Sequence, residues 1–342
     1  MTGLPWLETA SLFASGSDAL ARLVRWGVRE HGWRRVWLPS YYCPDVPSAL
    51  MAAAGSEVGL RAYADAELWA AHDLTTIAVA PGEVVVVANQ LGVRARTDTT
   101  ALEARGAAIV EDHSHDLASD WALESTADFA FASLRKTLPI PDGGAVWSPR
   151  GLALPPELTA GSQANATEGA TARPIARLAA SLATRKPPAA DDRLRFRALA
   201  RTVAEPGGRP AHPGISPVSR SLLPQMPVDA WRGRRRRNLA MLADAVASAS
   251  NAQVLVAPAG GVAFALTLLF RTDEERVAAQ RALTARAVVP SVLWPLDPAR
   301  DWGVGEADAD VSSRIFSIHG DQRYDDADMR QLAAVLREVL RG

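Results

Sequence analysis

The sequence predicts an α/β protein with a large, mainly parallel sheet and a smaller α+β region near its C-terminal end. In the first half, amphipathic helical segments alternate with short β-branched runs. One of these runs, residues 83–88, contains four consecutive valines, which is typical of a strand buried on both faces of a parallel sheet. After an Ala-, Pro- and Gly-rich stretch, helical and strand patterns return from about residue 228.

The elements of the first half follow from hydrophobic periodicity. A helix is predicted over residues 17–30, where Leu20, Leu23 and Val24 share one face. The strand–helix alternation favours crossover connections between parallel strands. A short helix is predicted over residues 99–105, and strands over residues 35–39, 57–63, 83–88, 107–111, 128–134 and 144–148.

Two domains are predicted. Residues 151–215 are an irregular connector, because Pro and Gly interrupt every helical pattern there. The large domain then spans residues 10–215, including this connector, and the small α+β domain spans residues 216–342. In the small domain, helices are predicted over residues 228–247, 274–285 and 326–340, and strands over 254–257, 263–270 and 314–318.

Composition restricts the class of protein. The net charge of -1 over 342 residues offers no electrostatic basis for binding nucleic acid, and the longest apolar stretch is too short to span a membrane. No signal peptide is evident, so we expect a cytoplasmic protein. A single cysteine, Cys43, excludes an internal disulfide and a multi-cysteine metal site. Among 37 basic residues only Lys136 and Lys186 are lysines, so lysine chemistry has two candidates.

The first candidate site segment opens the helix predicted over residues 17–30. Ser15, Gly16 and Ser17 are small, so their backbone N–H groups and hydroxyls can approach a phosphate at the positive end of the helix dipole. The alternative is an ordinary helix cap formed by a serine.

The second segment, residues 110–116, follows a predicted buried strand, where ligands of open α/β sheets bind. A carboxylate there, Asp112, can keep a pyridine nitrogen protonated and so make the ring an electron sink. The same stretch also fits a metal-dependent hydrolase built on Asp112, His113, His115 and Asp116, if the strand continues and directs both imidazoles to one face.

The third segment places Ser133 and Lys136 directly after the next strand. The hydroxyl can bind a cofactor phosphate while the amine reaches the cofactor's aldehyde. Because a free lysine has a pKa near 10.4, the site must favour its neutral amine. A Gly-Gly turn, residues 141–144, leads into the following strand.

The order of these segments resembles fold-type I enzymes that use pyridoxal 5′-phosphate (PLP). More narrowly it resembles the DegT/DnrJ/EryC1/StrS group, the sugar aminotransferases. Residues 110–112 are similar to that group's Val/Ile-Glu-Asp, and residues 15–20 to its Ser-Gly-Thr-x-Ala-Leu phosphate turn. Residues 38–43 are similar to its Pro-Ser-aromatic segment beneath the cofactor ring, which brings in Tyr41 and Tyr42.

The resemblance implies roles for individual residues. Lys136 forms the internal aldimine, Asp112 binds the pyridine nitrogen, and both are catalytic. His115, also expected to be catalytic, stands where the group has a Gln near the cofactor phenolate, and Cys43 stands at the ring-stacking position. Two residues are missing between Ser133 and Lys136 relative to the group's pattern. Because Lys136 is kept, the dehydratase branch, which has His there, is disfavoured.

The function that the resemblance implies is an aminotransferase of specialised metabolism. Its partners would be a small-molecule amino donor and acceptor, and a second copy of the chain in a homodimer with interfacial active sites. A PLP-dependent lyase, decarboxylase or replacement enzyme, and a non-catalytic binding module, are the alternatives that remain beside the metal-dependent hydrolase.

Three further features of the second half bear on the substrate. Arg323 can pair with a substrate carboxylate or form a structural salt bridge, and Trp294 can line the substrate pocket or lie in the core. The arginine-rich run 232–237 is interpreted as a solvated helix face.

Overall fold

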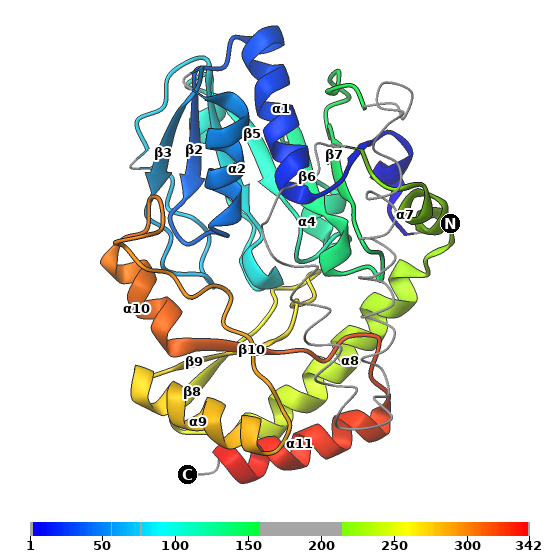
Figure 1. The fold of residues 1–342 in the computed structure, drawn as a ribbon, viewed down its shortest axis with the longest axis vertical. Coiled ribbons are helices and arrows are strands. Elements are labelled where there is room, and N and C mark those ends of the chain that lie inside the picture. Colours follow the sequence, from blue (N-terminus) through cyan, green and yellow to red (C-terminus); the bar gives the residue numbers. More distant parts are fainter. Residues whose placement is uncertain (1–2, 56, 76, 158–213, 341–342) are drawn as a thin grey trace.

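The computed structural model describes residues 3–55, 57–75, 77–157 and 214–340 (Figure 1). Most of the predicted connector, and Lys186 within it, lie outside the described residues. Within the described chain, the strands form one sheet of seven and one of three.

The larger sheet is mainly parallel, as predicted. Its order is β1-β7-β6-β5-β4-β2-β3, and the five strands from β6 to β3 run parallel to their neighbours, whereas β7 is antiparallel to both β6 and β1. The strands are β1 (Ser11–Phe13), β2 (Arg35–Pro39), β3 (Gly59–Tyr63), β4 (Glu83–Ala88), β5 (Ala108–Asp112), β6 (Phe129–Ser133) and β7 (Gly144–Trp147).

Helices α1 (Gly16–His31) and α2 (Asp45–Ala54) pack against each other on one face of this sheet (Figure 1). Leu20, Leu23 and Val24 of α1 are fully buried in one core cluster with Val84 and Val86 of β4, so the helical stripe read from the sequence is the packing face. Two short helices, α3 (Thr100–Glu103) and α4 (Asp120–Leu123), lie in the connections before β5 and β6. Ser15 caps α1, and Gly32 ends it in a left-handed conformation.

The smaller sheet is antiparallel, with the order β10-β9-β8: β8 is Ala252–Leu255, β9 Leu266–Phe270 and β10 Ile315–Ile318. Helices α8 (Val228–Val246), α9 (Asp273–Ala285) and α11 (Asp326–Leu340) pack with it around one apolar core (Figure 1). The helix α10 (Glu306–Arg314) leads into β10.

The stretch from Ile215 to Val228 packs with the larger sheet rather than the smaller one. Its helix α7 (Pro217–Leu222) and the 3-10 turn Leu223–Gln225 follow Ile215, which lies in the same core cluster as residues of β6 and β7. Asp142 fixes this stretch, because its carboxylate accepts hydrogen bonds from the Ser216 backbone N–H at 2.9 Å and from the Ser216 hydroxyl at 2.7 Å.

Most predicted elements lie within two or three residues of the observed ones, and the differences have local causes. The strand predicted over 254–257 is β8, two residues earlier, and β9 begins at Leu266 rather than at residue 263. Among the described α-helices and strands, five were not predicted: β1 has only three residues, α4 is a single turn, α2 follows Pro44, α7 begins at Pro217, and α10 is rich in Asp and Ser.

Among the described helices, none combines the length and the apolar character that crossing a membrane requires.

Two glycines allow the start of α1 to approach the edge of the sheet. A Cβ atom on Gly144 would lie 2.1 Å from the Ser15 carbonyl oxygen, and one on Gly16 would lie 2.7 Å from the Ser133 Cβ. Both contacts are closer than real Cβ atoms approach. The first turn of α1 therefore lies directly beside the ends of β6 and β7.

We expect Gly144→Ala to destabilise the protein by about 1–3 kcal/mol, because the added methyl group meets backbone that cannot rotate away. Gly59→Ala is the matched control: it is also a strand glycine, but its nearest neighbour is 3.7 Å away, and its effect should stay within about 0.5 kcal/mol. Urea unfolding of both variants measures the difference. Equal stabilities would contradict the close approach.

Candidate active site

The candidate site lies at the carboxyl ends of the parallel strands. The segments that leave β2, β4, β5 and β6 there bring together Tyr42, Leu91, Asp112 and Lys136, among other residues. In open α/β sheets this edge is where ligands bind.

Lys136 stands at the centre of the site. It ends a 3-10 turn, Leu134–Lys136, that follows β6 directly, and its Nζ lies 3.1 Å from His115 Nε2 and 5.4 Å from the ring centroid of Trp294. Burial lowers the pKa of Lys136 below its ordinary value, although Asp112 and Cys43 oppose this shift. The site therefore favours the neutral, nucleophilic form of the amine.

The hydrogen bonds around His115 define its tautomer. The Leu91 backbone N–H donates to Nδ1 at 3.1 Å, so Nδ1 carries no proton. Burial, and then the neighbouring Lys136, hold the pKa of His115 well below 6.5, with a smaller opposing effect of the Asn89 backbone. A neutral ring must then carry its proton on Nε2, and this N–H faces Lys136 Nζ. A neutral lysine amine accepts that hydrogen bond, whereas an ammonium group has no lone pair to do so.

Leu91 is positioned for this contact by an unusual backbone conformation. It has φ 54° and ψ 7°, a left-handed geometry that costs a leucine about 1–2 kcal/mol. Phe264, which leads into β9, donates its backbone N–H to the Leu91 carbonyl at 2.8 Å, and its ring centroid lies 5.0 Å from that of His115. The smaller sheet thus supports the turn that orients His115.

Asp112 is the last residue of β5 and is buried. Its Oδ2 accepts a hydrogen bond from the Tyr42 hydroxyl at 2.5 Å, and its Oδ1 accepts one from the Ser114 backbone N–H at 2.8 Å. Burial raises the pKa of Tyr42 well above 10, and the nearby Asp112 adds to this, so the tyrosine stays a donor. A carboxylate has about four acceptor positions, so Asp112 retains capacity for a further N–H donor.

The predicted phosphate-binding residues come together. Gly16 and Ser17 form the first turn of α1, and Gly16 lies against Ser133 at the end of β6. Ser15 caps the helix: its hydroxyl accepts from the Asp18 backbone N–H at 3.2 Å and donates to the Asp18 carboxylate at 2.6 Å. Both interpretations of this segment are therefore compatible, since a capped helix start also faces Ser133.

The other predicted ring-contacting residues surround this centre unequally. The Tyr41 hydroxyl donates to the Leu293 carbonyl at 2.8 Å, and its ring lies 6.5 Å from Trp294, so Tyr41 packs toward the segment before α10. Trp294 is half-buried beside Lys136 and His115. Cys43 is half-buried, and burial raises the pKa of its thiol, which Lys136 opposes.

The four residues of the metal alternative do not converge. The strand ends at Asp112, so the two histidines diverge: His113 Nε2 lies 2.9 Å from Glu111 Oε2, while His115 turns to Leu91 and Lys136. Asp116 instead accepts hydrogen bonds from Arg232 at 3.0 Å and from the Val262 backbone N–H at 2.7 Å. In the described part of the chain, no three such side chains are grouped to hold a metal ion.

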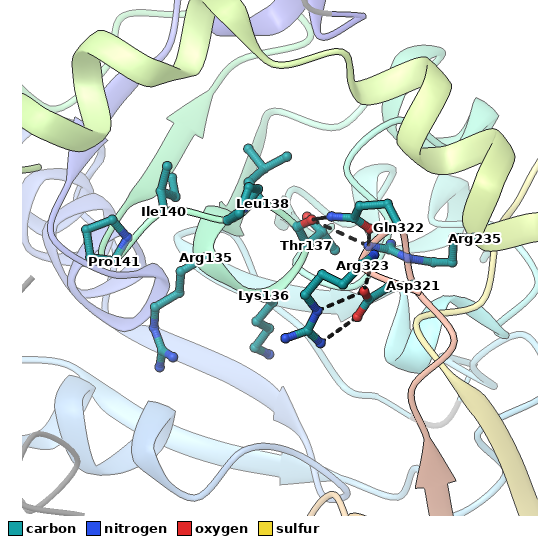
Figure 2. Close-up of a pocket in the computed structure, with 11 residues that line it drawn as sticks. Arg135, Lys136, Thr137, Leu138, Ile140, Pro141, Arg235, Asp321, Gln322 and Arg323 are labelled. Atoms are coloured by element: carbon teal, nitrogen blue, oxygen red, sulfur yellow. Dashed lines mark hydrogen bonds and ion pairs between the residues drawn. The ribbon is translucent and has the colours of Figure 1, made fainter. Parts of the chain in front are cut away.

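A cavity of about 310 Å³ adjoins Lys136 (Figure 2). It is lined by residues 135–141, by Arg235 of α8 and by the loop that follows β10, residues 321–323. Arg323 forms a bidentate ion pair with Asp321, with distances of 2.8 and 2.6 Å, so the predicted carboxylate binder has an internal partner in this structure.

The interpretation of residues 232–237 as a solvated face is wrong for two of its arginines. Arg232 is paired with Asp116, and Arg235 is only 5% exposed in the wall of the cavity. They are three residues apart on α8 and so lie on one face, a spacing visible in the sequence. Sequence reasoning also missed Leu91, Thr137 and Gln322, which belong to no motif.

Comparison with known proteins places the fold. An aminotransferase, TlmJ from Streptoalloteichus hindustanus, superposes with a TM-score of 0.63 at 16% identity, over 98% of this chain and 86% of that one. A DegT DnrJ EryC1 StrS aminotransferase from Brucella abortus gives 0.59 at 14% identity, over 98% and 87%. The chain has the fold of these aminotransferases.

A third structure with this aminotransferase fold, NtdA from Bacillus subtilis, contains the bound cofactor PMP; its TM-score is 0.64 at 12% identity, over 98% of this chain and 74% of that one. The predicted fold class, a fold-type I PLP-dependent transferase, and the resemblance to the DegT/DnrJ/EryC1/StrS group are confirmed at the level of the fold. No family model and no curated protein matches the sequence.

The lowered pKa of Lys136 makes a prediction about stability. Between that lowered pKa and the ordinary value of 10.5, the unfolded chain binds more protons than the folded one, so the stability of the wild type rises with pH there. At neutral pH the buried amine is costly. We therefore expect Lys136→Met to be more stable than the wild type near pH 7, with the difference shrinking as the pH approaches 10.5.

Urea unfolding of the apoprotein at a series of pH values measures this difference. Arg135→Met, which removes an exposed charge from the adjacent position, is the control and should keep most of the wild-type pH dependence. A constant difference between Lys136→Met and the wild type would show that the amine is not destabilised by burial.

Proposed function

We propose that this protein is a PLP-dependent aminotransferase of specialised metabolism, with Lys136 as the residue that holds the cofactor covalently. The observation that carries the proposal is the contact between Lys136 Nζ and His115 Nε2 at 3.1 Å, beside the buried carboxylate of Asp112. A neutral lysine amine, a fixed N–H donor and a carboxylate at one sheet edge are the groups that a pyridoxal ring requires.

The residues present fit the cofactor. Gly16 and Ser17 at the start of α1, together with Ser133, would hold the phosphate through backbone N–H groups and hydroxyls. Asp112, held by Tyr42 and Ser114, would accept the pyridinium N–H with its remaining lone pairs. The cofactor, when bound, supplies an electron sink for the carbon next to the substrate nitrogen.

The chain's own residues have distinct tasks in this reaction. Lys136 would accept and return the proton that the reaction moves on the substrate, a role that the lowered pKa of its amine favours. His115 would present its Nε2–H to the cofactor's phenolate, the role that the resemblance assigns to this position. Asp112 would accept the N–H of the ring nitrogen and so favour its protonated form.

The same proposal includes the organisation of the chain. The larger sheet and residues up to about 215 would form the cofactor-binding domain, and residues 216–342 the small domain, although Ile215–Val228 packs with the larger sheet. The small-molecule amino donor and acceptor would enter beside Trp294. The homodimer with interfacial sites and the cytoplasmic location stay predictions.

We expect protein reconstituted with PLP to absorb in the visible or near-ultraviolet range, and borohydride reduction to fix the cofactor on the peptide that contains Lys136. Peptide mapping by mass spectrometry identifies the modified lysine. Lys136→Arg, which keeps a long nitrogen-bearing side chain but cannot form the covalent bond, is the control and should abolish labelling. Labelling at Lys186, or none at all, would overturn the assignment.

The reaction type is tested by a half-reaction. L-Glutamate should convert the bound cofactor to pyridoxamine phosphate and release one equivalent of 2-oxoglutarate, which absorption and product analysis record. His115→Gln should retain this conversion within about tenfold, because the amide can still donate a hydrogen bond, and a general acid–base contribution would instead be worth ~100-fold or more.

A different pattern would favour the alternative reactions. His115 is an imidazole next to Lys136, and such a group can act as a second acid or base. Product release from an amino-acid substrate without pyridoxamine phosphate, lost in His115→Gln, would replace transamination by a lyase or replacement reaction.

A further inference from the structure

The cavity beside Lys136 carries an excess of positive charge. Three arginines, Arg135, Arg235 and Arg323, line it together with the amine of Lys136, against a single acid, Asp321. Asp321 is already committed to Arg323 through two hydrogen bonds, and Figure 2 shows this pair beside Lys136. The remaining cations therefore have no carboxylate partner in the cavity wall.

Arg235 is the most constrained of these cations. It is 5% exposed, and its Nη2 donates only to neutral acceptors, the Gln322 Oε1 at 3.2 Å and the Thr137 carbonyl at 3.4 Å. Its Nε finds no acceptor among the described residues. Burial lowers the pKa of Arg235, which Asp321 and Asp116 oppose. A buried guanidinium without an anion is costly, so the fold retains a charge that it does not itself neutralise.

A second polar group in the same wall is also unsatisfied. Thr137 is 8% exposed, and within the described chain its hydroxyl Oγ1 has no hydrogen-bond partner. Thr137 directly follows Lys136 and lies next to Gln322 and Arg235 (Figure 2). Two unpaired donors, one of them charged, thus line one cavity next to the reactive amine. Buried donors are normally paired, which indicates an acceptor other than the described residues.

We propose that this cavity binds a carboxylate of an amino-acid or keto-acid substrate, with Arg235 as its charged partner and Thr137 as a second donor. The inference rests on the proposed function, because Lys136 belongs to the cavity wall. The planar fork of a guanidinium matches the two oxygens of a carboxylate. A volume of about 310 Å³ suits a ligand the size of an amino acid, at the lower end of the range for small-molecule sites.

The test uses succinate, a dicarboxylate with no amine or carbonyl group that could react with Lys136 or PLP. Isothermal titration of the full chain, with and without added PLP, should show that succinate binds. Arg235→Met should weaken this binding about 10- to 100-fold, as expected for the loss of a hydrogen bond to a charged group. Arg236→Met, the exposed next residue on the same helix, is the matched control and should bind as the wild type does.

Gln322→Glu provides a second variant in case Arg235→Met does not fold. The new carboxylate would stand where the Gln322 amide now meets Arg235 at 3.2 Å, so it should pair with the guanidinium. The substitution also removes the hydrogen bond that the Gln322 amide donates to the Thr137 carbonyl at 3.0 Å, so the melting temperature should stay near that of the wild type, while succinate binding is lost. Undiminished binding in a folded Gln322→Glu or Arg235→Met protein overturns the proposal.

Two further measurements complete the test. The first asks whether the site prefers a phosphoryl group to a carboxylate. The second distinguishes a failure of this inference from a failure of the proposed function. If inorganic phosphate or thymidine diphosphate binds in an Arg235-dependent manner and succinate does not, the site is a phosphoryl site and the carboxylate proposal is wrong. Arg235-dependent succinate binding in a protein that PLP never labels at Lys136 would support the subsite while rejecting the aminotransferase. Labelling at Lys136 without any succinate binding would reject only the subsite.

Discussion

The site depends on one proton between two nitrogen atoms. His115 Nε2 and Lys136 Nζ are 3.1 Å apart, and a hydrogen bond between them needs one donor and one acceptor. The Leu91 N–H decides which is which, because it occupies Nδ1 and leaves the ring proton on Nε2. The neutral form of the Lys136 amine can accept this hydrogen bond, in line with the lowered pKa that burial gives it. A backbone group two strands away thus orients the imidazole that faces the residue expected to carry the chemistry.

The remaining structure can be understood as support for that arrangement. The valines of β4 are completely buried and hold the strand that leads into Leu91, while β5 and β6 place Asp112 and Lys136 at the same sheet edge. The first turn of α1 reaches Ser133 only because Gly16 and Gly144 have no side chains. From the segments around the smaller sheet, Phe264 and Trp294 pack near His115, and Arg235 of α8 and Arg323 after β10 extend the site into the adjoining cavity.

The fold was largely predictable from the sequence, because its main elements have strong periodic patterns. The alternation of a buried valine strand with amphipathic helices defines a parallel sheet, and β2 and β4 were predicted at their observed ends. The three-residue strand β1 and the helix α2, which follows Pro44, have no such periodicity and were missed. Their positions are set by tertiary contacts, which local patterns do not record.

The site was predictable only where residue chemistry sits at a strand end. Asp112 and Lys136 were identified that way, and the structure brings them to one edge of the sheet, with Asp112 among the charges that act on Lys136. Leu91 contributes its backbone N–H to His115, and Arg235 contributes a guanidinium that is buried in the cavity wall. Neither a backbone conformation nor the burial of one arginine can be read from the sequence.

The left-handed turn at Leu91 has a mechanical consequence. The Leu91 side chain is buried in the apolar core of the smaller sheet, and its carbonyl is bonded to Phe264, yet its N–H belongs to His115. Leu91 therefore connects the apolar core of the smaller sheet directly to the Nδ1 atom of His115. A displacement of that sheet would therefore reach the hydrogen bond at Nδ1 without passing through any other side chain. The orientation of the imidazole beside Lys136 is in this way tied to the packing of a second sheet.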